Sequence, residues 1–557
     1  MSDQDYSAPD YDAIIIGAGF AGLYAMYRLR GLGLTVHGFE RGDDVGGTWY
    51  WNRYPGARCD VESMYYSYSF SPELEQEWEW TERFPAQPEI LRYAGHVADR
   101  FGLRSGFSFG TTVTAADWDE AAGHWSVTTG DGQRVTARFL ISAVGCLSAS
   151  RVPDFPGLAD FQGATYHTGQ WPHEGADFTG KRVAVIGTGS SGIQAIPVIA
   201  EQAAHVTVFQ RTPAYSLPAR NRPLRPDEVA AVKADYPQIR ARMRVAPGGT
   251  PTPMPPIGKA LEVPSEKRHA EFMERWEAGG TTFMTTFTDT TRDAAANEVS
   301  AQFVRERIRE IVRDPATADL LTPRDYPIGT KRICLDTDYW ATFNRDNVTL
   351  VSVRDSPVEA ITPAGILVGG TEYQADAIVF ATGYDAMTGP LTEIGIRGAG
   401  GQLLRDKWAA GPRTYLGIAS AGFPNLLMVT APGSPSVLAN MMVAIEQHVD
   451  WVTGLLAYAR SHGIARVEAE AGHEDRWVEY VNELAATTLY PKAASWYMGA
   501  NVPGKPRVFM PYIGGMGRYR EECDKVAADG YPGFTLTPRT PLTPLAPLTP
   551  LIAEEGS

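Results

Sequence analysis

Cysteine is scarce in this chain of 557 residues: only Cys59, Cys146, Cys334 and Cys523 occur. They lie far apart in the sequence, and no Cys-x-x-Cys pair is present. A redox dithiol and a structural zinc site are therefore not expected. No other metal site is predicted. So few cysteines favour a reduced, cytoplasmic protein.

Long apolar runs and an excess of positive charge are also missing. The sequence has no apolar run of about 18 residues or more, and no charged-then-apolar leader, so we expect neither membrane insertion nor secretion. Asp and Glu number 65 against 50 Lys and Arg. This balance argues against nucleic acid or an anionic membrane as the main partner. Composition is that of a globular protein, and the length predicts three or four domains. The oligomeric state stays open.

Two glycine-rich turns stand out in what the sequence does contain. In each, a short apolar run leads into Gly-x-Gly-x-x-Gly, then a helical stretch, then a second apolar run. One match alone could be an ordinary tight turn, but two in this setting predict two dinucleotide-binding folds. The glycines let the backbone approach a pyrophosphate, and the helix N-terminus supplies amide donors. The predicted binding residues are Gly17, Gly19, Phe20 and Gly22 in the first turn, and Gly187, Thr188, Gly189, Ser190, Ser191 and Gly192 in the second.

The residue that follows each second strand separates the two ligands. The first strand pair ends in Glu40, a carboxylate placed to accept hydrogen bonds from ribose hydroxyls, which suits the adenosine half of FAD. The second ends in Gln210-Arg211-Thr212. Arg211 is either a solvated surface arginine or a partner for a 2′-phosphate, and its position favours the second role. We therefore predict FAD in the first site and NADPH, rather than NADH, in the second.

These patterns predict an α/β protein with two Rossmann-like dinucleotide-binding domains, for FAD and for NADP. Residues 221–323, which follow the second glycine motif, have helical spacing and many prolines. This pattern indicates a helical insertion in the NADP domain. The C-terminal Thr-Pro-Leu triplets predict an extended tail. The expected divisions are 1–145 and 381–536 for the FAD domain, 146–220 and 324–380 for the NADP domain, 221–323 for the insertion, and 537–557 for the tail.

Two nucleotide folds without a dithiol narrow the chemistry. NADPH can reduce a flavin, and the flavin must then pass electrons to something other than a protein disulfide. Oxygen is the simplest acceptor. The residues by themselves lead to an FAD- and NADPH-dependent oxidoreductase and no further.

A resemblance to a known family carries the interpretation beyond that point. Residues 161–172, FQGATYHTGQWP, resemble the Baeyer–Villiger monooxygenase fingerprint FxGxxxHxxxW(P/D) at every fixed position, just before the second glycine turn. Residues 46–60 resemble a second family signature, GGxWxx(F/Y)PGxxxD. The resemblance covers nearly the whole chain except the tail. It includes the segments 329–332, 381–385, 433–436 and 495–497, and is nearest to phenylacetone monooxygenase and the steroid and cyclic-ketone monooxygenases.

The resemblance implies that the protein converts ketones to esters or lactones with NADPH and O2 through a flavin C4a-peroxide, with sulfoxidation as a side activity. It implies that Arg332 supplies a fixed positive charge to the reacting oxygen and that Asp60 positions this arginine. Taken singly, each would be an ordinary surface charge; only the motif context selects them. His167 of the fingerprint is interpreted as a hydrogen-bonding hinge residue between the domains rather than as a catalytic base.

The resemblance also assigns residues around the cofactors and the substrate. Lys331 is expected to hold the 2′-phosphate together with Arg211 and Thr212, and Trp496 to bond the nicotinamide ribose. Trp49, Trp51 and Trp171 could instead be core aromatics, or serve partly as such. The implied partner is a small ketone, whether aryl-alkyl, cyclic or steroidal. The remaining residues implied are Thr48, Trp49, Asp60, Tyr66, Val113, Met441 and Arg332 near the cofactors, and Ser436, Val437, Leu438 and Met441 in the substrate pocket.

Three alternatives stay open at this point. One is a flavin monooxygenase specialised for sulfur or nitrogen, which Trp171-Pro172 and the Asp60 and Arg332 motifs disfavour. A second is a pyridine-nucleotide disulfide reductase, which the missing dithiol disfavours. The third is a flavoprotein that serves as a redox-sensing interaction module. The C-terminal tail is the only feature of the sequence that favours it.

Overall fold

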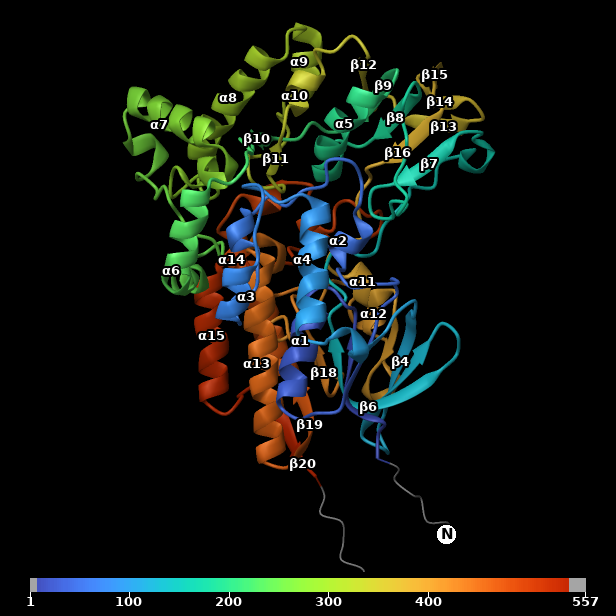
Figure 1. Ribbon diagram of the computed structural model, residues 1–557, viewed down its shortest axis with the longest axis vertical. Coiled ribbons are helices and arrows are strands. Elements are labelled where there is room, and N and C mark those ends of the chain that lie inside the picture. Colours follow the sequence, from blue (N-terminus) through green and yellow to red (C-terminus); the bar gives the residue numbers. More distant parts are fainter. Residues whose placement is uncertain (1–7, 540–557) are drawn as a thin grey trace, which may run out of the picture.

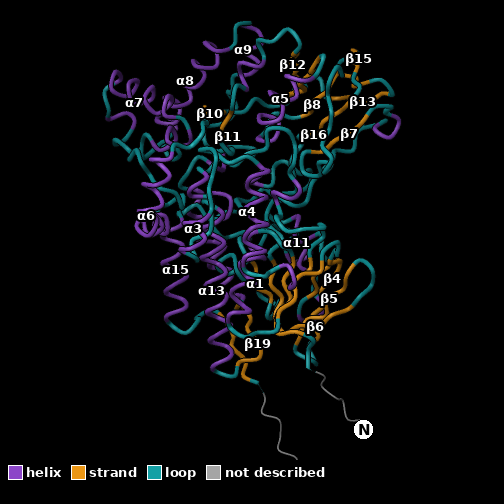
Figure 2. Tube along the Cα trace, viewed as in Figure 1, coloured by secondary structure: helices purple, strands orange, loops and turns teal. Residues whose placement is uncertain are grey.

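The chain forms two α/β blocks, one above the other in the view of Figure 1. A computed structural model describes residues 8–539. The middle of the chain, drawn in green to yellow, makes the upper block, and both ends of the chain contribute to the lower one (Figure 1). The strands gather in two separate groups, one in each block (Figure 2). Below, these are the first (lower) and second (upper) nucleotide domains.

The first nucleotide domain is built on an eight-stranded sheet. Ile14 and Ile15 of its central strand are fully buried, as expected of a parallel strand covered on both faces. An antiparallel meander, β4-β5-β6, extends one side, and β18 pairs with β6. The order is β17 (Gly395–Arg397), β4 (Val113–Asp119), β5 (His124–Thr129), β6 (Arg134–Ser142), β1 (Tyr11–Ile16), β2 (Val36–Phe39) and β3 (Phe107–Ser108), with β18 at Leu426–Met428.

Long helices cover this sheet, as the blue, orange and red ribbons in Figure 1 show. The helix that follows β1 packs against a 21-residue helix from the C-terminal part of the chain, so residues more than 400 positions apart share one core. A short antiparallel pair, β19 (Ile464–Ala469) and β20 (Phe534–Pro538), closes the lower end. The helices are α1 (Phe20–Gly31), α3 (Pro72–Glu77), α4 (Gln87–Arg100), α13 (Met441–Ser461), α14 (Ala471–Ala486) and α15 (Met516–Ala528).

The second nucleotide domain contains a five-stranded sheet in which every pairing is parallel. Helix α5 (Ser190–Gln202) follows β8, and a small antiparallel sheet flanks the domain. The main order is β12 (Val348–Ser352), β9 (His205–Gln210), β8 (Arg182–Ile186), β16 (Ala377–Phe380) and β7 (Ala164–His167); the flanking strands are β13 (Val358–Thr362), β14 (Gly365–Val368) and β15 (Thr371–Gln374).

The helical stretch between residues 221 and 323 is shared by the two domains. Helix α6 (Pro226–Val245) packs on the first domain, where Tyr236 donates to the carbonyl oxygen of Met64 at 3.0 Å and Arg240 pairs with Glu75 at 2.7 Å. The helices after it join the core of the second domain instead. Their bounds are α7 (Ser265–Ala278), α8 (Ala294–Ile311) and α9 (Pro315–Leu321).

The predicted fold class, two Rossmann-like domains with mixed α/β layers, is confirmed. Of the predicted tail, Thr537 and Pro538 belong to β20, and residues 540–557 lie outside the described residues. Within residues 8–539, no helix combines the length and the apolarity needed to cross a bilayer.

Candidate functional site

The first glycine turn links β1 to α1. Gly17 has a φ of +102°, and a Cβ there would lie 2.7 Å from the carbonyl oxygen of Ala143, so only glycine fits. No side chain caps the N-terminus of α1 at Gly19, which leaves its first amides free for an anion. Glu40, directly after β2, is buried and accepts a hydrogen bond from the Ala18 amide at 2.7 Å. Burial raises the pKa of Glu40, and hydrogen bonds from the backbone amides of Ala18 and Gly42 oppose that rise.

The predicted flavin contacts are distributed around this turn. Trp49, on the short helix α2 (Thr48–Trp51), donates from Nε1 to the Tyr66 hydroxyl at 3.2 Å. The Phe20 ring packs edge-on against Tyr66, so all three aromatics belong to one core. Val113 begins β4, and Met441 begins α13. The structure thus places these residues on different elements of the first domain.

The second glycine turn repeats this geometry between β8 and α5. Gly187 has a φ of +108°, and no side chain caps α5 at Gly189. A Cβ at Gly189 would meet nothing within 4 Å, so the turn faces open space. Thr188 donates to the carbonyl oxygen of Thr212 at 3.2 Å, which ties the turn to the end of β9. Ser190, the first residue of α5, accepts a 3.0 Å contact from the Cys334 thiol.

Two cations meet beside this second turn. Arg211, directly after β9, is exposed, and Lys331 lies with its Nζ 4.4 Å from the centre of the Tyr326 ring. Burial lowers the pKa of Lys331, and the nearby charge of Arg211 lowers it further. An anion bound between the two cations would relieve the repulsion that this effect on the Lys331 pKa reports. The pair therefore fits the 2′-phosphate of NADP, and the uncapped helix ends fit the pyrophosphates of both dinucleotides.

Asp60 and Arg332 are joined across the boundary between the two nucleotide domains. Arg332 donates from Nε to Asp60 Oδ2 at 3.0 Å and from Nη2 to Oδ1 at 2.6 Å. This is the two-pronged geometry that holds a guanidinium in a fixed orientation. The charge of Asp60 raises the pKa of Arg332, so the arginine keeps its proton at every pH the fold tolerates. The two residues are 272 positions apart in the chain.

The remaining donor of Arg332 points to the predicted substrate segment. Its Nη1 donates to the carbonyl oxygen of Val437 at 2.7 Å. Tyr497 also lies against the guanidinium, whose charge offsets part of the rise in the pKa of Tyr497 that burial causes. Sequence reasoning missed Tyr497, although it lies next to Trp496 in the segment that resembles the family. Arg332 of the second domain is thus held by three segments of the first, which carry Asp60, Val437 and Tyr497.

An apolar cluster adjoins Arg332. Val437 is buried within it, and Leu438, Met441 and Trp496 pack against it. Ser436 adopts a φ of +43°, and its buried hydroxyl has no hydrogen-bond partner within residues 8–539. The other buried members are Cys146, Ala386, Met387, Ala485, Tyr497, Phe509 and Met510. The predicted substrate residues therefore share one apolar environment with the predicted nicotinamide contact.

The fingerprint belongs to the second domain, where it includes β7. His167 ends β7 and is buried; its Nδ1 accepts the Gly169 amide at 3.0 Å, and burial lowers its pKa. The ring packs edge-on against Tyr384 at 6.1 Å. Trp171 stacks on Tyr166 in the core of the second domain, so it serves as a core aromatic. A neutral His167 that packs against Tyr384, in the chain that follows β16, agrees with the hinge interpretation. That interpretation stays a prediction.

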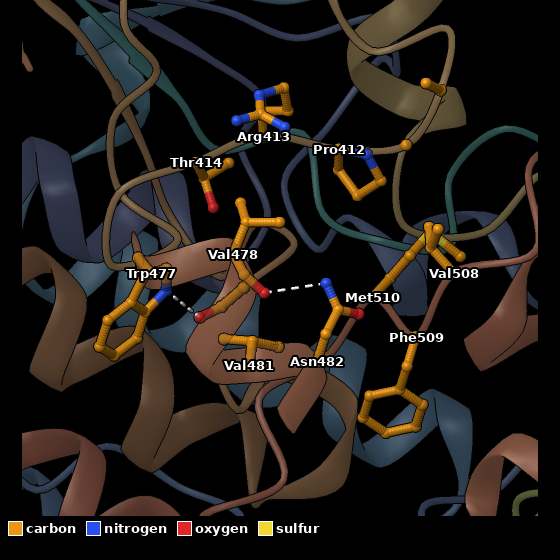
Figure 3. A pocket seen from close by; sticks show the side chains of 13 residues that line it. Pro412, Arg413, Thr414, Trp477, Val478, Val481, Asn482, Val508, Phe509 and Met510 are labelled. Atoms are coloured by element: carbon orange, nitrogen blue, oxygen red, sulfur yellow. Dashed lines mark hydrogen bonds between the residues drawn. The ribbon is translucent and has the colours of Figure 1, made fainter. Parts of the chain in front are cut away.

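A pocket lies between residues 508–510 and α14 (Figure 3). Val478 and Val481 of α14 face Val508 and Met510 across it, and the Trp477 indole donates to the carbonyl oxygen of Gly433 at 3.0 Å. None of the residues that line it was predicted from the sequence as a site residue.

A buried carboxyl of the second domain leads to a prediction about how stability depends on pH. Asp336 ends β11 (Cys334–Asp336) and accepts a hydrogen bond from the Ser216 hydroxyl. Burial raises the pKa of Asp336 to about 6, so ionising it costs the folded state up to about 3 kcal/mol as the pH rises from about 4 to about 6. Asp336→Asn keeps the shape and loses the charge. We expect this variant to have a higher Tm than the parent at pH 7.5 and an equal Tm near pH 4. A gain of the same size at both pH values would contradict the assignment.

The sequence and the fold are similar to those of known proteins. The flavin-binding monooxygenase-like family matches residues 12–222. The chain is 42% identical to the acetone monooxygenase (methyl acetate-forming) of Gordonia sp. (strain TY-5), over 95% of this chain and 100% of that protein. Its fold matches a structure described as oxidized steroid monooxygenase bound to NADP, with 52% identity, a TM-score of 0.90 and coverage of 95% and 99%. It also matches OTEMO in complex with FAD and NADP, with 40% identity, a TM-score of 0.92 and coverage of 95% and 100%.

Proposed function

The chain belongs to the flavin-binding monooxygenase-like family and to its Baeyer–Villiger members, and from this premise we propose which of its residues perform the reaction and which ketones it accepts. The protein is an FAD- and NADPH-dependent monooxygenase that converts ketones to esters or lactones with molecular oxygen. The observation that supports our assignment of the reaction centre is the Arg332–Asp60 pair, which joins both nucleotide domains beside an apolar cluster.

The two glycine turns divide the cofactors between them. We assign FAD to the first turn, with Glu40 at its ribose and Thr48, Trp49, Tyr66, Val113 and Met441 around the rest. We assign NADP to the second turn, with Arg211, Thr212 and Lys331 at the 2′-phosphate and Trp496 at the nicotinamide ribose. When bound, FAD accepts a hydride from NADPH and activates oxygen.

Arg332 contributes a permanent positive charge at the reaction centre. Negative charge develops on the ketone oxygen as its carbonyl carbon is attacked, and a fixed guanidinium stabilises that charge without having to reorient. Asp60 is the positioning residue, because its two oxygens bind two of the arginine's nitrogens. Apolar side chains lie beside Arg332, and a bound ketone that packs against them displaces water from the site.

The side chains beside Arg332 indicate the substrate class. Val437, Leu438 and Met441 are apolar, and Arg332 is the ionisable side chain that we place at the centre. Such a surface suits an uncharged, largely apolar ketone and disfavours an amine, because the only charge placed there is positive and Asp60 already neutralises part of it. We propose cyclic and aryl-alkyl ketones as substrates, with steroidal ketones at the upper size limit. Sulfoxidation is proposed as a side activity, because an uncharged thioether is apolar enough to bind the same surface.

A product screen tests these proposals. The purified holoenzyme is supplied with NADPH, 18O2 and, in turn, acetone, cyclohexanone, phenylacetone, a steroidal ketone and methyl phenyl sulfide. We expect one 18O atom in the ester or lactone of cyclohexanone or phenylacetone, and a slower yield of sulfoxide. Oxygenated sulfur without any ester from the four ketones would overturn the proposed substrate class.

The same screen on Val437→Ala tests the pocket assignment. Removing two methyl groups widens the cavity, so we expect the ratio of kcat/KM for the steroidal ketone to that for acetone to rise about tenfold. Val478→Ala, in the pocket of Figure 3, is the matched control and should leave that ratio unchanged. An unchanged ratio in Val437→Ala would place the substrate elsewhere.

A further inference from the structure

The segment that carries Trp496, residues 495–510, is a closed loop and is called here the Trp496 segment. The Met510 amide donates to the carbonyl oxygen of Tyr497 at 2.9 Å, which joins the two ends of the loop. Gly499 has a φ of +69°, and a Cβ there would lie 2.7 Å from the carbonyl oxygen of Pro506. The chain therefore folds back on itself directly after the short helix Trp496–Met498.

The base of this loop is fastened to the first nucleotide domain by apolar packing. Phe509 and Met510 are buried, and the Gly433 amide donates to the carbonyl oxygen of Met510 at 2.7 Å. Figure 3 shows Val508 and Met510 on the wall of the pocket opposite Val478 and Val481 of α14. These contacts fix where the loop begins and ends.

The tip of the loop is held differently, by polar contacts to the return linker, residues 381–388, which leads from β16 back to the first domain. Lys505 forms an ion pair with Asp385 and donates to the carbonyl oxygen of Ala386 at 2.7 Å. Asn501 donates to the carbonyl oxygen of Tyr384 at 2.6 Å. The Lys505 side chain is only 10% exposed, so its charge depends on these oxygens in place of water.

The return linker is in turn pressed against the fingerprint. The Tyr384 ring packs on His167, and a Cβ at Gly169 would lie 2.5 Å from that ring. The Tyr384 hydroxyl also donates to Asn52 of the first domain. One short stretch of chain thus contacts the fingerprint, the first domain and the tip of the Trp496 segment.

We propose that the Lys505–Asp385 pair is a latch that positions the Trp496 segment on the return linker and so sets how tightly NADP is retained. The inference rests on the proposed role of Trp496 at the nicotinamide ribose. Lys505 and Asp385 are positioning residues: they act through the loop and contact no reacting atom. An ion pair suits a contact that must open, because water can replace its partners when the loop lifts, which is not true of the apolar base.

Limited proteolysis with trypsin measures how often the loop leaves the return linker. Arg507 is exposed, and it is the one cleavable site between Lys492 and Arg518, because the Lys505–Pro506 bond resists trypsin. Cleavage after Arg507 requires the loop to leave the linker, so its rate follows the open population. We expect Asp385→Asn and Lys505→Met to be cut there about tenfold faster than the parent. The exchange Asp385→Lys with Lys505→Asp should restore most of the resistance.

Binding of NADP+ supplies a second measurement that needs no turnover. The latch variants should bind NADP+ five- to tenfold more weakly in equilibrium dialysis, and NADP+ should slow their cleavage less than it slows that of the parent. Asp117→Asn is the matched control, since it removes the Arg397–Asp117 pair at the far edge of the first sheet. It should behave like the parent in both assays.

Each outcome bears on the latch itself, whatever the substrate turns out to be. Parent-like cleavage at Arg507 in both single variants would overturn the proposal. Faster cleavage along the whole chain with a lowered Tm would overturn it too, because the pair would then support the fold in general. Faster cleavage at Arg507 with unchanged NADP+ binding would retain the latch but refute its effect on the dinucleotide.

Discussion

Arg332→Ala is expected to accept hydride from NADPH at a rate close to that of the parent and to form ester at least 100-fold more slowly. Reduction depends on the dinucleotide sites, which this substitution leaves in place. Attack on the ketone depends on positive charge at the developing oxyanion, and removing one such donor costs roughly 100- to 1,000-fold in other enzymes. NADPH consumption should continue, with hydrogen peroxide as the product. Anaerobic stopped-flow measures the reduction, and gas chromatography the ester.

Two companion variants separate charge from geometry at this position. Arg332→Lys keeps a charge but cannot bind both oxygens of Asp60, so its ester yield should lie between those of the parent and of Arg332→Ala. Asp60→Asn leaves the guanidinium in place with a weaker partner and should also lower ester formation. Parent-like ester formation by Arg332→Ala would remove Arg332 from the reaction centre.

The double variant Arg211→Ala/Lys331→Ala is expected to lose roughly 100-fold or more in kcat/KM for NADPH while the value for NADH stays nearly constant. Both cations flank the space assigned to the 2′-phosphate, and NADH has no phosphate there. The repulsion that lowers the pKa of Lys331 is relieved when the phosphate binds, so each single variant should show part of the effect.

Arg182→Ala is the matched control for this experiment. Arg182 begins β8, at the end of the strand opposite the glycine turn, and pairs with Asp376. Its removal should leave the ratio of NADPH to NADH activity unchanged. If the double variant kept the parent's preference for NADPH, the 2′-phosphate would have to bind elsewhere.

The sequence by itself determined both nucleotide domains. A glycine turn, its flanking strand and its helix lie within about 30 residues, so their physical requirements are visible locally. Gly17 and Gly187 are needed for a positive φ, and Glu40 and Arg211 follow their strands directly. The fold class and both cofactors could therefore be predicted without coordinates, and the comparisons confirm them.

The tertiary structure alone decided how distant segments meet. Asp60 and Arg332 are 272 positions apart, and no spacing rule links them; the resemblance implied the pair, and the fold shows the two hydrogen bonds that form it. Helix α6 has the same helical pattern as its neighbours in sequence, yet it packs on the first domain, because Tyr236 and Arg240 find their partners there.

Two further contacts also depend on the tertiary structure: that of Tyr497 with Arg332 and that of Lys505 with Asp385. In the sequence, Tyr497 is one aromatic among many and Lys505 one charge among many. Their roles arise because a closed loop brings one onto the guanidinium and the other onto the return linker. Local chemistry thus determined what the protein binds, whereas long-range packing, which depends on the whole core, decided which side chains meet at the reaction centre.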